Sequence, residues 1–103
     1  MSRLDDLQKL TAKTKKPLPW YGLAMEYRGL GDLAQAVATF RHVHVVDPRY
    51  VAAYFMCGQV LSELGENDAA AAELRTGIEV ARAEGDGHAV GEMSSLLDTL
   101  SAL

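Results

Sequence analysis

The chain repeats itself with a period of 34 residues. Residues 17–50 and residues 51–84 align without a gap when they are set one above the other. Small residues face each other at Ala24 and Gly58, and each copy carries a Leu-Gly pair, at 30–31 and at 64–65. Self-similarity at a fixed period of this size is typical of chains that stack one supersecondary unit on the next. We therefore expect a stacked repeat protein whose function lies on a surface rather than in a pocket.

Each copy has the pattern of two helices joined by a tight turn. The packing positions of its first helix fall at i, i+3, i+4 and i+7. In the first copy Gly29 and Gly31 supply a stop, because glycine enters the left-handed conformation without steric cost, and Asp32 can cap the next helix. Pro48 ends that helix. The packing positions are Trp20, Leu23, Ala24, Tyr27, Leu33, Ala36, Val37, Phe40 and Val43, then Tyr54, Cys57, Gly58, Leu61, Ala70, Leu74, Ile78 and Ala81.

The two segments outside the repeats each have the pattern of one amphipathic helix. Ser2 can cap the first helix and Asp86 the last. The first helix carries a leucine stripe that we expect to cover the first repeat; the alternatives are that it plugs the groove of its own chain or contacts a second chain. The last helix caps the stack, which would otherwise expose an apolar side. The stripes are Leu4, Leu7 and Leu10, and Ala89, Met93, Leu96, Leu97 and Leu100.

These residues resemble the tetratricopeptide repeat, whose motif is W-x2-L-G-x2-Y, then A-x3-F, then P, in a 34-residue unit. The first copy departs from it only at Ala24, whereas the second keeps Gly58, Ala70 and an aromatic residue, Tyr54, at the tryptophan position. The resemblance implies an all-α fold, a short right-handed α-solenoid of two repeat units between two capping helices. The single domain then divides into residues 1–16 (helix and linker), 17–50 (repeat 1), 51–84 (repeat 2) and 85–103 (capping helix). The six matching residues of the first copy are Trp20, Leu23, Tyr27, Ala36, Phe40 and Pro48.

The resemblance also implies a function. Proteins similar to this one act as non-catalytic protein-interaction modules that bind a peptide or protein segment in the concave groove lined by the first helix of each repeat. The groove lacks the Lys-Asn pair with which one subgroup grips a terminal carboxylate, so we expect an apolar or amphipathic ligand. The alternative is a structural homo-oligomer that uses the groove or the leucine stripe for self-contact. The positions that would line the groove are Leu18, Tyr21, Met25, Arg28, Ala52, Phe55, Gln59 and Ser62.

Composition limits the remaining function classes. Apolar residues make up 49% of the chain and charged residues 23%, as in ordinary globular proteins. No apolar run is long enough to span a bilayer, and the first residues lack a signal-peptide pattern, so we expect a cytoplasmic protein without membrane contact. The basic residues of segment 13–16 are too few for a nucleic-acid footprint in a chain of net charge −4.

Neither a cofactor nor a catalytic group is indicated by sequence spacing. His42 and His44 are two residues apart, so on a helix they diverge by about 200° and cannot share an ion unaided. His88 lies in a separate turn, far along the chain from any cysteine. The single cysteine, Cys57, stands at a core position with no activating base near it in sequence. We therefore expect no metal site, no cofactor and no enzymatic activity.

Overall fold

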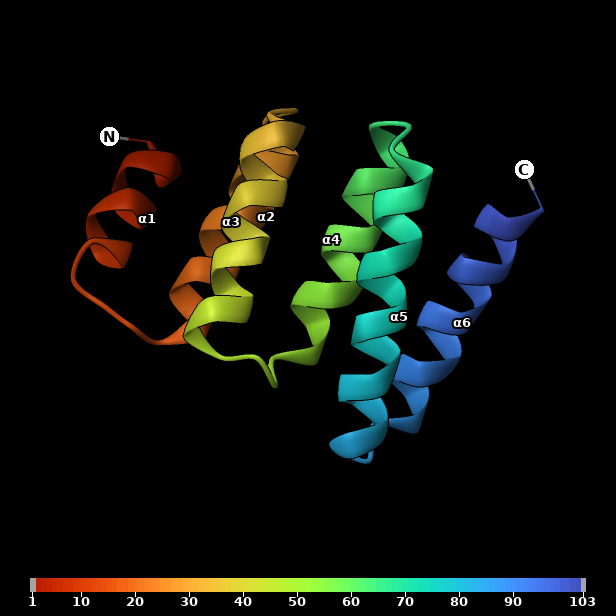
Figure 1. Ribbon diagram of the computed structural model, residues 1–103. Helices are drawn as coiled ribbons and strands as arrows, with labels where there is room; N and C mark the ends of the chain where they lie inside the picture. Colours follow the sequence, from red (N-terminus) through yellow and green to blue (C-terminus); the bar gives the residue numbers. More distant parts are fainter. Residues whose placement is uncertain (1, 103) are drawn as a thin grey trace.

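The computed structural model describes residues 2–102 of the chain, and these form six α-helices and no strand. In Figure 1 the pairs α2–α3 and α4–α5 stand in a row, with α1 at one end and α6 at the other. The predicted α-solenoid is thus confirmed, whereas Met1 and Leu103, the outermost residues of the predicted end segments, lie outside the described residues. The helices are α1 (Arg3–Thr11), α2 (Pro17–Gly29), α3 (Leu33–Val46), α4 (Val51–Glu63), α5 (Asn67–Ala83) and α6 (Gly87–Ser101).

The same turn follows α2, α4 and α5. A glycine with positive φ stands in each, Gly31 at 80°, Gly65 at 78° and Gly85 at 71°. The left-handed conformation predicted for Gly29 is wrong, because Gly29 is the last helical residue of α2. In the first turn the Asp32 amide donates back to the Tyr27 carbonyl at 2.9 Å, which satisfies a carbonyl that the helix end leaves open. The Asp32 carboxylate then accepts a hydrogen bond from the backbone N–H of Gln35 at 3.3 Å and caps α3, as the sequence predicts.

The core runs along the row of helices, from α2 to α6. Nearly all the predicted packing positions are buried, while Trp20, Tyr27 and Leu33 are half-buried. Gly58 allows close packing within repeat 2, since a Cβ at this position would lie 2.6 Å from Leu74 Cδ2. A second close approach, at Gly77 on α5, has no counterpart in the sequence predictions.

Helix α1 packs against one side of α2. A Cβ on Gly22 would lie 3.6 Å from Leu7 Cδ2, and Gln8 Nε2 donates to the Tyr27 hydroxyl at 3.0 Å. The α2 residues in these contacts are Gly22 and Tyr27, and neither is a predicted groove residue. Helix α1 therefore covers the end of the row, as expected. The predicted leucine stripe is wrong at one position: Leu10 is 51% exposed, and the neighbouring Thr11 is buried in its place.

Helix α6 is amphipathic in the way that the sequence predicts. Of its predicted apolar stripe, Met93 and Leu100 are buried and Ala89, Leu96 and Leu97 are half-buried, whereas the polar residues Glu92, Ser95 and Asp98 are exposed. None of the described helices combines the length and the apolar character needed to cross a bilayer.

Candidate functional site

The eight predicted groove residues lie on two helices, four on α2 and four on α4, and we call this surface the α2–α4 face. Leu18 is 65% exposed, a large value for an apolar side chain, and Ala52 is also exposed. The other members are half-buried, so each presents part of its side chain to solvent while the rest packs against the core. They are Tyr21, Met25, Arg28, Phe55, Gln59 and Ser62.

Tyr21 is built into an aromatic cluster. Its ring centroid lies 5.7 Å from that of Phe40 and 5.3 Å from that of Tyr50, with the planes tilted in both pairs. Burial raises the pKa of Tyr21, and the neighbouring Tyr50 raises it further, whereas Arg28 lowers it. The hydroxyl is therefore neutral at physiological pH, and the ring offers a rigid, partly apolar surface to a ligand.

Arg28 is held by an ion pair across the ends of the two helices. Its Nη2 donates to Glu63 Oε1 at 2.6 Å, which ties α2 to α4. Because its charge is offset by Glu63, Arg28 presents a compensated charge rather than a free cation at the edge of the α2–α4 face.

A second cluster lies on the other side of the helices, where α3, α4 and α5 meet. His44, Cys57 and Glu73 bring a ring nitrogen, a thiol sulfur and a carboxylate oxygen to within 4.8 Å of one another. We call these three residues the junction site. His44 Nε2 bonds to Glu73 Oε1, and the imidazole stacks on the Tyr54 ring at a centroid distance of 3.8 Å and an angle of 7°. The Tyr54 hydroxyl donates to the Pro48 carbonyl at 2.8 Å, so the stacked ring is itself fixed.

The Cys57 thiol is held protonated. Burial raises its pKa to about 12, and the Glu73 carboxylate adds to the rise, while Arg41 acts in the opposite direction. A nucleophilic cysteine needs the thiolate, so the presence of His44 and Glu73 does not make Cys57 an activated nucleophile.

The sequence analysis missed the junction site because it looked for a base near Cys57 along the chain. The repeat alignment contains a signal that could have found it. Leu23 and Thr39 are the residues of repeat 1 opposite Cys57 and Glu73, so repeat 2 replaces a leucine and a threonine with more reactive groups at two packed positions. His44 completes the site from the helix of repeat 1 that packs on α4.

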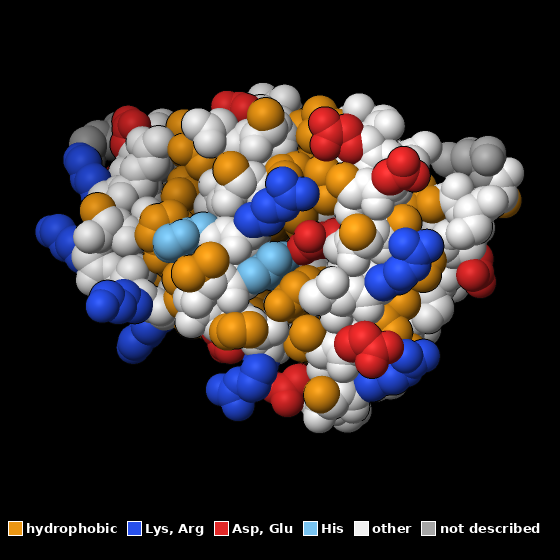
Figure 2. Space-filling view, in the orientation of Figure 1, with side chains coloured by type: hydrophobic (Ala, Val, Ile, Leu, Met, Phe, Trp, Pro, Cys, Tyr) orange, Lys and Arg blue, Asp and Glu red, His pale blue; other side chains and the backbone are white. Residues whose placement is uncertain are grey.

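Figure 2 shows the side of the molecule on which α3 and α5 lie in front of α2 and α4. Histidine and acidic side chains lie beside each other near the centre of this side, among apolar side chains. The side chains of His44 and Glu73 keep 17% and 13% of their surface exposed, whereas Cys57 is fully buried beneath them. The junction site is therefore a mostly buried cluster in which His44 and Glu73 keep a small part of their surface accessible to solvent.

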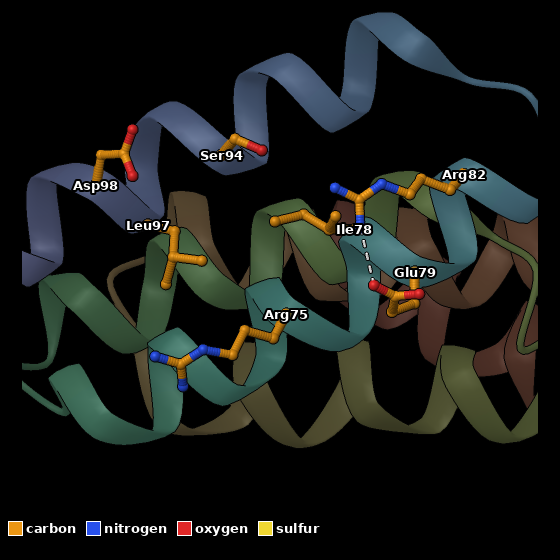
Figure 3. Close-up of a pocket in the computed structure, with 7 residues that line it drawn as sticks. All are labelled: Arg75, Ile78, Glu79, Arg82, Ser94, Leu97 and Asp98. Carbon is orange, nitrogen blue, oxygen red and sulfur yellow. Dashed lines mark hydrogen bonds and ion pairs between the residues drawn. The ribbon is translucent and has the colours of Figure 1, made fainter.

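A cavity of about 360 Å³ lies between α5 and α6 (Figure 3). Side chains of both charges line it together with Ile78 and Leu97, and Arg82 is paired with Glu79 at 2.9 Å. This mixed lining favours no particular ligand. Its residues are Arg75, Ile78, Glu79, Arg82, Ser94, Leu97 and Asp98.

Comparison with known proteins agrees with this architecture. A family model for the tetratricopeptide repeat matches residues 27–90, so the chain belongs to the tetratricopeptide repeat family. A tetratricopeptide repeat domain protein from Salinibacter ruber, solved by NMR in solution, is 31% identical, with a TM-score of 0.81. The match covers 85% of this chain and 89% of that chain. No curated protein matches the sequence.

Two more distant structures have the same fold. PcrH, solved in complex with the chaperone binding region of PopD, is 19% identical with a TM-score of 0.88, over 97% of this chain and 80% of that chain. The type III secretion translocator chaperone SycD of Yersinia enterocolitica is 18% identical with a TM-score of 0.87, over 96% of this chain and 70% of that chain.

Proposed function

We propose that the chain is a non-catalytic interaction module that binds an apolar or amphipathic segment of another protein on its α2–α4 face. The observation that carries the proposal is that apolar side chains of the α2–α4 face keep part of their surface accessible: Leu18 is 65% exposed, and Tyr21, Met25 and Phe55 are half-buried. The ion pair between Arg28 and Glu63 holds the ends of the two helices together. The fold that the chain shares with PcrH supports it, because that protein was solved with a segment of another protein bound.

The polar members of the face limit the chemistry of the ligand. Arg28 is engaged with Glu63, so an acidic ligand would have to compete with an existing ion pair. Gln59 and Ser62 can hydrogen-bond to a ligand backbone, and Met25 can adapt to side chains of different shape. A helix with one apolar side, or an extended segment with apolar residues, fits this combination.

A peptide-display selection followed by affinity measurements tests the proposal. Leu18→Ser and Phe55→Ala should each weaken binding of the selected peptides about tenfold or more, because each removes an accessible apolar side chain from the face. The matched control is Val45→Ser, which removes an apolar side chain that is 76% exposed on α3. Peptides that bind the two variants as tightly as the wild type, or that are lost only with Val45→Ser, would refute the site.

Light scattering over a concentration series tests the alternative of self-association. A dimer that dissociates in the Leu18→Ser variant would show that a second copy occupies the face, and would replace the proposed partner.

Arg28→Gln should change stability little. The ion pair with Glu63 is partly exposed, with 29% and 43% of the two side chains accessible, and such pairs contribute about 1 kcal/mol or less. We expect urea unfolding to show a loss within that range, and apolar peptides to keep their affinity. A loss of peptide binding as large as that for Phe55→Ala would instead identify Arg28 as a recognition residue for an acidic ligand.

A further inference from the structure

We propose that His44, Cys57 and Glu73 form a zinc site that joins the two repeats. The three residues come from α3, α4 and α5, so an ion bound to them would link the second helix of repeat 1 to both helices of repeat 2. The junction site shares no residue with the α2–α4 face, and the proposal is therefore independent of the proposed function.

The ligand atoms are close enough to bind one ion. Ligands of a tetrahedral zinc ion lie about 2.0 to 2.3 Å from the metal, which separates them from one another by roughly 3 to 4 Å. The three candidate atoms lie within 4.8 Å of one another, and His44 and Glu73 already touch. The three atoms therefore need to approach one another only slightly to share one ion.

The donor set selects the metal. A thiolate, an imidazole nitrogen and a carboxylate oxygen are all common zinc ligands, whereas magnesium and calcium prefer oxygen alone. The thiolate and the carboxylate carry two negative charges, which neutralise a divalent ion in a mostly buried place. The Tyr54 ring holds the imidazole by stacking at 3.8 Å, so one ligand is oriented before the ion arrives.

Binding is an exchange of ligands and a proton without redox change. The Cys57 thiol gives its proton to solvent as its sulfur bonds to zinc. His44 Nε2, which bonds to Glu73 before the ion arrives, gives its proton to solvent and binds the ion through its lone pair, while Nδ1 takes up a proton from solvent, so the imidazole stays neutral and its proton count does not change. The bond between His44 and Glu73 is replaced by one bond from each residue to the ion. Water can complete the coordination from the side of His44 and Glu73, whose side chains are the partly exposed members of the site.

Cobalt and zinc titrations of the purified full chain, stripped of metal beforehand, test the site. Cobalt bound to a thiolate gives an intense charge-transfer absorption in the near ultraviolet, which histidine and carboxylate ligands alone do not give. We expect this band to appear at one cobalt per chain, to disappear when zinc is added, and to be absent from Cys57→Ser. Zinc should also raise the melting temperature of the wild type.

Two further variants distinguish zinc binding at the junction site from zinc binding by exposed surface residues. Glu73→Gln keeps the size of the side chain, and it should weaken zinc by more than the roughly 10- to 100-fold that loss of an outer-shell partner costs. His88→Ala is the matched control, because His88 Nε2 lies 2.9 Å from Glu92 Oε1 on the exposed side of α6, a histidine-carboxylate pair without a cysteine. It should leave zinc affinity and the cobalt band unchanged.

The proposal is overturned if the wild type gives no thiolate-to-cobalt band, or if zinc binds Glu73→Gln as tightly as the wild type. It is also overturned if zinc affinity is lost only with His88→Ala. Far-ultraviolet circular dichroism identifies a variant that fails to fold; if Cys57→Ser does so, the band in the wild type and the affinity of Glu73→Gln still decide.

Discussion

The two repeats place different chemistry at equivalent positions. Repeat 1 has Leu23 and Thr39 where repeat 2 has Cys57 and Glu73, and the members of each pair are 34 residues apart. The Thr39 hydroxyl donates to the Gln35 carbonyl of its own helix at 2.7 Å, so it needs no partner elsewhere. Glu73 instead reaches across to His44 on α3. The repeat fold is therefore compatible with a leucine and with a threonine whose hydroxyl bonds within its own helix. The cysteine and the glutamate are specific to repeat 2.

The repeats also differ in how closely the next helix approaches. Val43 in repeat 1 and Gly77 in repeat 2 occupy equivalent positions, and both are buried. A Cβ at Gly77 would lie 2.5 Å from Tyr54 Cβ and 2.6 Å from Met93 Sδ. Repeat 1 thus has room for the branched side chain of Val43. In repeat 2 the glycine at the equivalent position allows α5 to pack closely against α4 and α6.

Gly77→Val, which gives repeat 2 the residue of repeat 1, should have the largest effect. Met93 can move its flexible end, but Tyr54 Cβ is fixed to the backbone of α4, so the helices must separate. We expect the free energy of unfolding to fall by about 3 kcal/mol in urea titrations.

The control for Gly77→Val is Gly91→Ala on α6. A Cβ at Gly91 would meet nothing within 4 Å, so this variant should gain up to about 1 kcal/mol from helix propensity. Equal changes in the two variants would contradict the close packing at Gly77.

Glu73→Thr, which again substitutes the residue of repeat 1, should have a smaller effect. It removes the partner of His44 Nε2, while the buried Nδ1 of the same ring has no hydrogen-bond partner among the described residues. An imidazole left unpaired inside the protein should lower the free energy of unfolding by about 1 to 3 kcal/mol, measured with a chelator present.

The control for Glu73→Thr is Glu79→Thr on the same helix. Glu79 pairs with Arg82, and both side chains are largely exposed, so the cost should stay within about 0.5 kcal/mol. A loss at position 73 no greater than the loss at position 79 would show that the bond to His44 does not stabilise the junction.

Most of the fold was predictable because its signals are local. The spacing of Trp20, Leu23 and Tyr27 follows from the geometry of one helix, and Asp32 caps through an amide only three residues away. The predicted stripe failed at Leu10, which is exposed, because the phase of a short helix is set by what it packs against rather than by its own sequence.

The candidate sites were predictable to different degrees. The residues of the α2–α4 face share two helices, as their periodicity predicts, although the ion pair of Arg28 with Glu63 depends on how α2 and α4 are placed. The junction site was missed because its members meet only through packing between repeats. His44 was compared with His42 on its own helix, while its neighbours in space, Cys57 and Glu73, come from two other helices.

The smallest effect predicted from the comparison of the two repeats concerns the pH dependence of stability, which should differ between them. Burial raises the pKa of the Cys57 thiol from 9.0 to about 12, so above pH 9 the unfolded chain loses this proton while the folded chain keeps it. The stabilising contribution is complete below pH 9 and is lost as the pH rises to about 12. By pH 10 it should have fallen by about 1 kcal/mol.

Comparing Cys57→Ala with Leu23→Ala isolates this contribution, because the two variants truncate equivalent positions of the two repeats. Burial also raises the pKa of Tyr21, Tyr50 and Tyr54, and these tyrosines affect the wild type and both variants alike. In chelated buffer, stability measured between about pH 8 and pH 10 should fall less steeply in Cys57→Ala than in the wild type, whereas Leu23→Ala should keep the wild-type slope. If Cys57→Ala also keeps it, the thiolate forms as readily in the folded chain as in the unfolded one, and Cys57 is not the buried, protonated thiol that distinguishes repeat 2.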